Sequence, residues 1–321
     1  IMTTPAEWGM ASIHHSGSAA FNEALQQLLP ANTDMLSEEE LFSAAGLAFI
    51  PPALRDRAEI IGQAKTGSLP ELIAPGDIRG IIHTHSTWSD GSHSIEQMAT
   101  AAKAAGLDYL VISDHSRSAT YANGLSEERI REQHQEIDRL NTALAPFKIF
   151  KSIECDILGD GQLDYTNEVL ATFDLVIASV HSNLKMSEEK AMQRLLTAIS
   201  NPYVTILGHM TGRLLLSRNG YPIDHNAIID ACIANHVVIE LNAHPRRLDI
   251  DWRWIGNVTE KGGLISINPD AHAVEGYADT RYGVLVAQKA MLTKEKNLSS
   301  FTLQAFESFL AATKKAKGLA A

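Results

Sequence analysis

The segment IIHTHSTWSDG, residues 81–91, joins an apolar run to three side chains that can bind a metal ion. Two isoleucines lead directly into His83 and His85, and Asp90 follows five residues after the second histidine. In an extended chain, residues i and i+2 point to the same side, so both imidazoles can reach one ion. We interpret the segment as the end of a buried strand that carries chemistry.

A repeated pattern of short apolar run, turn and amphipathic helix extends outward from this segment. We expect strands at 80–84, 109–113, 148–153, 174–180, 203–208, 236–241 and 263–268. We expect helices from Ser94, which forms a capping box with Gln97, and at 126–145, 164–172, 187–199, 224–235, 252–261 and near 301–315. This alternation predicts parallel strands with right-handed crossovers, and runs such as YLVIS indicate burial on both faces.

The first 76 residues lack the alternation of strands and helices that residues 77–321 show. They contain a helical pattern, a capping box at Ser37 and Glu40, the breaker Pro51-Pro52, and the linker GSLPELIAPGD. We therefore expect a small N-terminal appendage followed by one large domain. Because the first residue is isoleucine, a fragment of a longer protein is one interpretation of this sequence.

Composition limits the class of protein. The formal net charge is −11, which disfavours broad phosphate neutralisation of the kind that holds nucleic acid. No apolar run approaches 18 residues and no signal peptide is visible, so we expect a cytoplasmic protein with no membrane partner. Cys155 and Cys232 are far apart in apolar surroundings and are interpreted as reduced core residues.

Potential metal ligands follow almost every predicted strand at its carboxyl end. They are His83, His85 and Asp90 after the first strand, His115 after the second, Glu154 in the third, His181 after the fourth, His209 after the fifth, and Asp270 and His272 after the seventh. In a parallel barrel these ends meet at one rim, which is where such folds place their chemistry. We therefore favour a closed (β/α) barrel over an open sheet, with one shared metal site.

Nine ligands are too many for one tetrahedral ion, which takes four. We expect two or three divalent ions joined by a bridging carboxylate. A nitrogen and oxygen ligand set without thiolate suits Zn, Mn or Fe, and the sequence does not choose among them. A histidine at a strand end is usually an ordinary packing or surface residue, and we assign that role to the other seven: His14, His15, His93, His134, His225, His236 and His244. Asp114 and Asp156 are expected to orient a ligand histidine or a rim loop.

Five segments in order, HTHSTWSDG, ISDHS, SIECDI, SVHS and NPDAH, resemble the polymerase and histidinol phosphatase (PHP) family of metal-dependent phosphoesterases. The resemblance covers about residues 77–290. It implies a distorted seven-stranded β/α barrel with a trinuclear site. The family's ligand pattern would place one ion at His83, His85, Glu154 and Asp270, a second at Glu154, His181 and His209, and a third at Asp90, His115 and His272.

A closer resemblance is to the C-terminal PHP region of bacterial family X DNA polymerases. It is carried by LPELIAPGDIRGIIHTHSTWSDG, GHMTGRLL and ELNAHPRRLDIDW, with Met210 where that subgroup usually has proline. The segment SIHHSGSAAFNEAL is similar to the end of that polymerase's palm, so the appendage resembles palm end and thumb. No palm with paired aspartates precedes it in this sequence, and we do not expect the chain alone to polymerise DNA.

The chemistry that these residues indicate is hydrolysis of a phosphoester, in which cations activate a water and stabilise the developing charge. Glu154, Asp270 and His272 are the predicted catalytic residues. Four cationic side chains are candidates for holding the phosphate: Arg213, Arg247, Arg117 and Lys185.

Three functions compete at this point. The first is 3′–5′ exonuclease or 3′-end processing of DNA, with an upstream polymerase module as partner. The second is a phosphatase of the histidinol-phosphate kind that acts on a small phosphorylated substrate. The third is a non-catalytic accessory barrel, which the complete ligand set disfavours. An amidohydrolase also begins with H-x-H on its first strand, but it commonly has a bridging lysine later in the chain. Here the third strand supplies Glu154 and the fourth ends in His181, with no such lysine.

Overall fold

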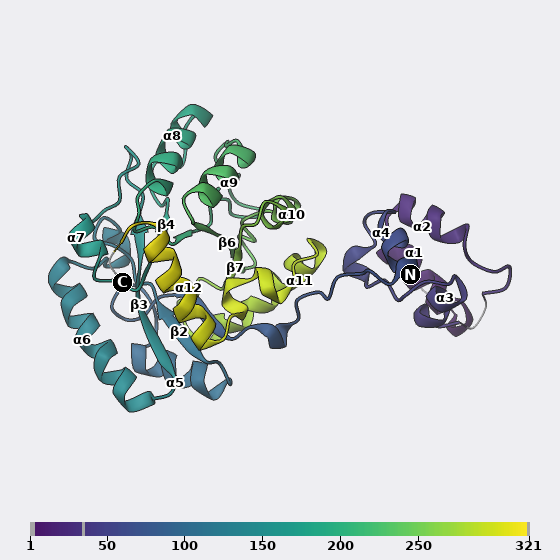
Figure 1. Cartoon of the computed structure of the whole chain (residues 1–321), viewed down its shortest axis with the longest axis horizontal. Helices are drawn as coiled ribbons and strands as arrows, with labels where there is room; N and C mark the ends of the chain where they lie inside the picture. Colours follow the sequence, from purple (N-terminus) through teal and green to yellow (C-terminus); the bar gives the residue numbers. More distant parts are fainter. Residues whose placement is uncertain (1–3, 34–35, 320–321) are drawn as a thin grey trace. The chain divides into compact units, whose positions relative to one another are not determined.

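A computed structural model describes residues 4–33 and 36–319, which form two compact units (Figure 1). The smaller unit comprises the chain up to Leu72 together with Gln288–Thr293. The larger unit comprises Ile73–Ala287 and the chain from Lys294 onward. Each unit has its own apolar core, so each is described by itself.

The smaller unit is a set of short helices around an apolar centre. Its helices are α1 Trp8–Ser16, α2 Ala19–Gln26, α3 Glu38–Ala44 and α4 Ile60–Thr66, with 3-10 turns η1 Pro5–Glu7 and η2 Pro52–Leu54. The predicted capping box is confirmed, because Ser37 accepts a hydrogen bond from the Glu40 amide and Glu40 accepts one from Ser37. The buried Arg55 guanidinium pairs with Glu38 at 2.5 Å, which satisfies its charge inside the unit.

The larger unit is a seven-stranded parallel barrel, as expected. The strands pair in chain order: β1 Gly80–Thr84, β2 Tyr109–Ile112, β3 Lys148–Asp156, β4 Leu175–Ser179, β5 Ile206–Leu207, β6 Val238–Asn242 and β7 Ile265–Asn268. The first and last strands meet at their carboxyl ends, where the His85 amide donates to the Ala271 carbonyl at 2.9 Å and the Ala271 amide donates to His83. Almost every strand residue is buried, which agrees with strands covered on both faces.

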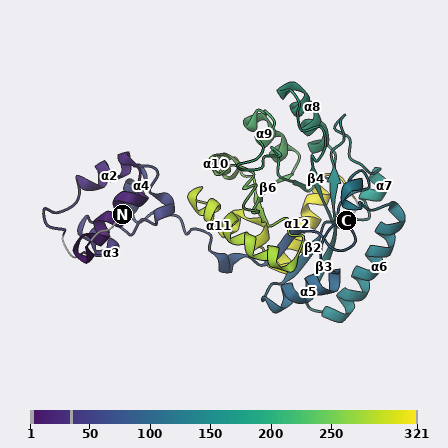
Figure 2. The same cartoon turned by 180° about the vertical axis from the view of Figure 1, so that it is seen from behind.

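Helices surround the strands in both views (Figures 1 and 2). They are α5 Ile95–Ala104, α6 Glu127–Leu144, α7 Asn167–Leu170, α8 Glu188–Ile199, α9 His225–Ala234, α10 Trp252–Glu260, α11 Thr280–Lys289 and α12 Leu303–Ala316, with 3-10 turns η3 Pro75–Asp77, η4 Thr120–Ala122, η5 Val274–Asp279, η6 Lys294–Lys296 and η7 Leu298–Ser300. The capping box of Ser94 and Gln97 at α5 is confirmed. Helix α11 was not predicted.

The barrel interior is an apolar core that α12 covers. Tyr109 of β2 stacks on Phe306 of α12 with ring centroids 4.5 Å apart, and Leu310 joins the same cluster as Ile82 and Ile177. These residues fill the barrel with side chains rather than leaving a channel. Polar side chains gather instead at the carboxyl ends of the strands.

Two strand ends depart from extended geometry. His83 has φ 66° and Asp270 has φ 54°, a left-handed conformation that is uncommon outside glycine. The pairing of β1 with β2 shifts register between Ile81 and Thr84. The sequence suggested that His83 and His85 point the same way because residues i and i+2 of an extended strand share a side. The strand is not extended at His83, so that explanation is wrong. A turn of the backbone at His83 brings the two imidazoles together.

Both cysteines are free and buried, as predicted. Within residues 4–33 and 36–319, none of the helices is long and apolar enough to cross a membrane.

Candidate metal centre

The nine predicted ligands lie together at the carboxyl ends of the strands. Eight of the nine form three groups, and within each group the ligand atoms all lie within 4.8 Å of one another. The groups are His85, Asp90, His115 and His272; His83, His85 and Asp270; and His115, Glu154 and His181. His209 joins them through its Nε2 atom, 3.0 Å from Glu154 Oε1. Because His85 belongs to two groups and His115 to two, the groups form one continuous cluster.

Glu154 lies at the centre of the cluster. Its Oε1 atom is 3.1 Å from His181 Nε2 and 3.2 Å from His83 Nε2, and its Oε2 atom is 3.1 Å from His115 Nδ1. Burial alone would raise the pKa of this carboxyl, but the imidazoles of His181 and His83 hold it well below its usual range. One ionised carboxylate thus faces several imidazoles, as a bridging ligand would.

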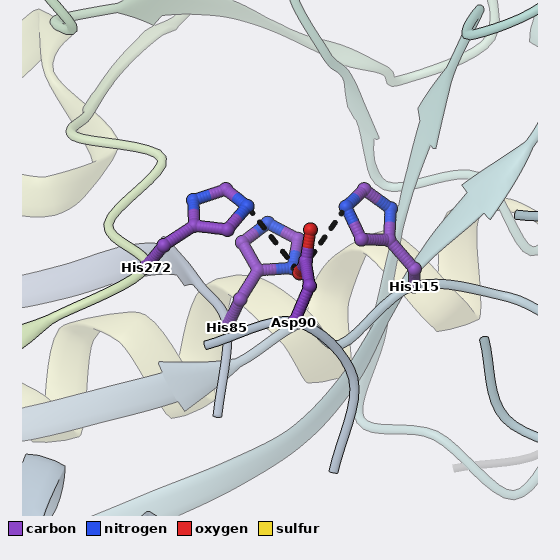
Figure 3. A group of neighbouring side chains, drawn as sticks. All are labelled: His85, Asp90, His115 and His272. Atoms are coloured by element: carbon purple, nitrogen blue, oxygen red, sulfur yellow. Dashed lines mark ion pairs between the residues drawn. The ribbon is translucent and has the colours of Figure 1, made fainter. Parts of the chain in front are cut away.

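Asp90 and His272 form the more open side of the cluster. Figure 3 shows the carboxylate of Asp90 between the rings of His272 and His115, with Nε2 of these two histidines 3.4 and 3.7 Å from Asp90 Oδ1. The side chains of His272 and Asp90 are 41% and 33% exposed, whereas His83 and His85 are fully buried. A substrate would therefore approach from the side of Asp90 and His272.

Glycine at position 91 lets Asp90 fold back over His85. A Cβ atom at Gly91 would lie 2.2 Å from the His85 carbonyl oxygen, and the Gly91 amide donates to the Ser86 carbonyl at 2.9 Å. Asp114 fixes the same loop, since it accepts hydrogen bonds from Ser86 and Ser89. Asp114 thus positions a rim loop, as expected for one of the two accessory aspartates.

Three histidines are oriented by an acceptor at their Nδ1 atom, which for two of them is a carboxylate that is not among the nine ligands. His83 Nδ1 lies 2.6 Å from Glu240 Oε1, His181 Nδ1 contacts Asp156, and His272 Nδ1 lies 3.0 Å from the Asp270 carbonyl oxygen. Because an ionised carboxylate or carbonyl can only accept, Nδ1 donates in each case. When the ring is neutral, Nε2 therefore carries the lone pair and faces the cluster, which is how proteins prepare histidine for a metal ion.

This donor set fits divalent cations. Among the described residues, the buried ring nitrogens His83 Nε2, His85 Nδ1 and His115 Nδ1 lack a hydrogen-bond partner, although each lies within 4 Å of a carboxylate oxygen. Buried polar atoms in that state are costly unless something else binds them. Imidazoles facing ionised carboxylates are the ligands that Zn, Mn and Fe accept.

Glu240 is a site residue that sequence reasoning missed. It is fully buried, its Oε2 atom accepts from the His209 amide at 2.7 Å, and its Oε1 atom accepts from Asn268 Nδ2 at 2.9 Å. Asn242 Nδ2 lies 3.3 Å from Glu240 and donates to Asp270 at 3.1 Å. The sequence did contain an indication, because a carboxylate and an amide interrupt the apolar run VIELN of β6.

The four predicted phosphate-binding cations have different surroundings. Arg247 Nε lies 3.4 Å from Asp270 Oδ2 and is thus beside the cluster. The Arg213 guanidinium donates to the Arg247 carbonyl at 2.9 Å and pairs with Asp251 at 2.8 Å, so it supports the loop that carries Arg247. Arg117 pairs with Asp164 and Glu127, and Lys185 is an exposed residue between β4 and α8. Phosphate binding by these side chains stays a prediction.

Comparisons with known proteins agree with this geometry. The PHP domain family model matches residues 82–244, which are 163 of the 321 residues. The protein named "DNA polymerase/3'-5' exonuclease PolX" of Bacillus subtilis (strain 168) is 42% identical over 274 residues, covering 85% of this chain and 48% of that protein. A "Probable phosphatase" of Acetivibrio thermocellus is 28% identical over 170 residues, covering 50% of this chain and 64% of that protein.

The chain thus spans less than two thirds of the length of these relatives. Among solved structures, histidinol phosphate phosphatase from Lactococcus lactis, in complex with zinc, L-histidinol and phosphate, matches with a TM-score of 0.50. It is 19% identical, and the match covers 66% of this chain and 94% of that one, which shows the fold. The barrel, the histidine and carboxylate cluster at its rim and the family match lead to one conclusion: this chain belongs to the PHP domain family.

Proposed function

We propose that the larger unit hydrolyses phosphoesters with two or three divalent ions, Zn, Mn or Fe, bound by the nine clustered side chains. The observation that carries this proposal is the position of Glu154, whose two oxygens lie 3.0 to 3.6 Å from five imidazoles contributed by four different strand ends. Five imidazoles around one buried carboxylate are typical of a metal site and not of an ordinary hydrogen-bond network at a protein surface.

Divalent ions held there would neutralise negative charge on a phosphate and make water a stronger nucleophile at neutral pH. The chain's own residues prepare this reaction. Glu240 and Asp156 fix the rings of His83 and His181, and the open side at Asp90 and His272 admits the substrate. Arg247 places a positive charge at the rim beside Asp270, where it can balance the charge of a bound phosphate.

We propose DNA 3′ ends as the substrate, with 3′–5′ exonuclease or 3′-end processing as the activity. The similarity of 85% of the chain to the Bacillus exonuclease supports this choice. We also propose that the smaller unit is a palm-end and thumb-like segment, that an upstream polymerase module is a partner, and that the protein acts in the cytoplasm.

A small-molecule phosphatase is the second candidate. It is favoured by the relatives named probable phosphatases and by the fold of histidinol phosphate phosphatase. The two candidates share the cluster and differ only in what lies beyond the phosphate.

The test combines elemental analysis with two substrates. We expect at least two equivalents of metal per chain and release of mononucleotides from the 3′ end of single-stranded DNA by the Mn-loaded protein. Glu154→Ala and His83→Ala should abolish the release. Hydrolysis of small phosphomonoesters alone would leave the phosphatase candidate, and fewer than two metal equivalents would contradict both.

A further inference from the structure

Tyr121 is a large aromatic side chain at the rim of the cluster that the proposed reaction does not use. It is 72% exposed, and its ring centroid lies 6.2 Å from that of His115. It interacts electrostatically with the carboxylates of Asp156, Glu154 and Asp90 and, more weakly, with the guanidinium of Arg247. A single exposed aromatic residue is ordinary on a protein surface. Tyr121 differs in its place, because its ring lies beside His115, one of the nine clustered ligands.

The turn that carries Tyr121 is fixed on both sides. Ala119, which precedes η4, and Ala122 within it are buried, whereas Tyr121 between them is exposed. Asn123 takes a left-handed conformation with φ 54°, and its side chain donates to the Trp88 carbonyl at 3.2 Å. Arg129 in turn donates to the Asn123 carbonyl at 2.8 Å. The backbone that carries the ring is thus fixed before any ligand arrives, which lowers the entropy lost on binding.

A nucleotide whose phosphate lies at the cluster carries its base to one side of that phosphate. Proteins bind unpaired bases chiefly by stacking them on exposed aromatic rings, because every base has a π face. The −11 charge of the chain disfavours a broad cationic surface for nucleic acid, so a site for single strands here gains from contacts other than phosphate neutralisation. An exposed ring beside the cluster supplies such a contact.

We propose that Tyr121 is the stacking platform for the base of the terminal nucleotide of single-stranded DNA. This inference rests on the proposed phosphodiester hydrolysis and names the part of the substrate that a small phosphomonoester without a base lacks. Tyr121 then determines specificity, and it takes no part in the bond breaking itself.

The first experiment measures stacking without cleavage. A single-stranded oligonucleotide ends in 2-aminopurine, joined by a methylphosphonate linkage that resists hydrolysis, and its fluorescence is recorded with Mn-loaded protein. We expect quenching by the wild type and by Tyr121→Phe, and loss of quenching with Tyr121→Ala. Leu285→Ala, which removes a 60% exposed side chain from α11, is the matched control and should behave as the wild type.

The second experiment compares cleavage of oligonucleotides that end in a normal or an abasic nucleotide. Tyr121→Ala should raise KM for the normal end by about 5- to 150-fold, the range of one base–aromatic stack, with a smaller change in kcat. The abasic end should be insensitive to the substitution. Equal quenching by Tyr121→Ala and wild type, or an equal effect on both ends, would overturn the inference. If the wild type cleaved neither oligonucleotide, the proposed cleavage of DNA 3′ ends would be wrong, and the inference about Tyr121 would be wrong with it.

Discussion

At the scale of single residues, the cluster depends on a carboxylate that does not belong to it. Glu240 accepts hydrogen bonds from the His83 ring, the backbone amide of His209 and the side-chain amide of Asn268. It therefore connects β6, on which it lies, with β1, β7 and the end of β5. Burying a carboxylate is costly unless every lone pair finds a donor, and here the donors are site residues. Glu240 therefore acts as a positioning residue for two predicted ligands.

Replacing Glu240 with alanine should lower metal affinity by about 10- to 100-fold, because the orientation of His83 is lost. The free energy of unfolding should fall by about 3 kcal/mol as the buried donors lose their partner. Metal titration and urea unfolding measure the two effects. Glu240→Gln keeps the shape of the side chain, and the same two measurements can be made on it if the alanine variant does not fold.

Ser266→Ala is the matched control, because the Ser266 hydroxyl donates to Asn268 within the same network without touching a histidine. It should cost about 1 kcal/mol of stability and leave metal affinity unchanged. Wild-type metal affinity in both Glu240 variants would contradict the positioning role.

At the scale of elements, the segment 85–91 after β1 depends on one glycine. Gly91→Ala would place a methyl group 2.2 Å from the His85 carbonyl oxygen, so the segment must shift. We expect a loss of stability of about 1–3 kcal/mol and a lower metal stoichiometry, since Asp90 moves with the segment. Thermal unfolding and elemental analysis would check this. Gly256→Ala in α10, where the added Cβ would meet only the flexible Glu260 side chain at 4.0 Å, should be neutral or stabilising by up to about 1 kcal/mol.

The residue that directly follows α12, Lys317, makes stability depend on pH. Burial lowers the pKa of Lys317 to about 8 from its usual 10.5, and its ammonium donates to the Val204 carbonyl. Because the folded protein then binds this proton less tightly than the unfolded chain, the lysine destabilises the fold at neutral pH. That destabilisation disappears as the pH rises from about 8 to 10.5.

Lys317→Met should therefore raise the free energy of unfolding at pH 7 by about 2 kcal/mol, after the lost hydrogen bond is subtracted. Its advantage over the wild type should shrink between pH 8 and pH 10.5. Urea unfolding at several pH values measures the difference between the two proteins. Lys315→Met, at an exposed position of the same helix, should change stability by less than about 0.5 kcal/mol at any of these pH values.

Prediction of elements succeeded where local pattern and burial agree. The seven strands and the helix after Ser94 follow from apolar runs and a capping box. Helix α11 was missed because Gly276 and Gly283 near its start oppose a helix by propensity. Gly283 is required there by packing, since a Cβ would lie 2.7 Å from the Ala243 side chain. Such a requirement exists only once the helix lies against the sheet.

At the scale of the whole molecule, the cluster couples metal binding to folding. It gathers ligands from β1 to β7, so ions that bind it stabilise the closed barrel and not the unfolded chain. Chelation should lower the melting temperature of the larger unit by about 5–10 °C for a metal present at 100 times its Kd.

Differential scanning calorimetry before and after chelation, and after Mn is restored, measures this shift. Glu154→Gln, which lacks the central ionised carboxylate, should show a much smaller response. An unchanged melting temperature of the wild type would show that the cluster holds no ion under those conditions.

The sequence by itself determined the parallel barrel, the two-part organisation that we expect, and the nine residues gathered at the rim, because strand periodicity and the common direction of parallel strands are properties of local sequence. Only the tertiary structure decided how these residues meet. The left-handed turn at His83 and the buried carboxylate of Glu240 come together across 157 residues of sequence, and Glu240 also accepts from His209 and Asn268, 31 and 28 residues away. Contacts at that separation form only when the barrel closes, so a local pattern can mark Glu240 as unusual in its strand but cannot predict which side chains it contacts.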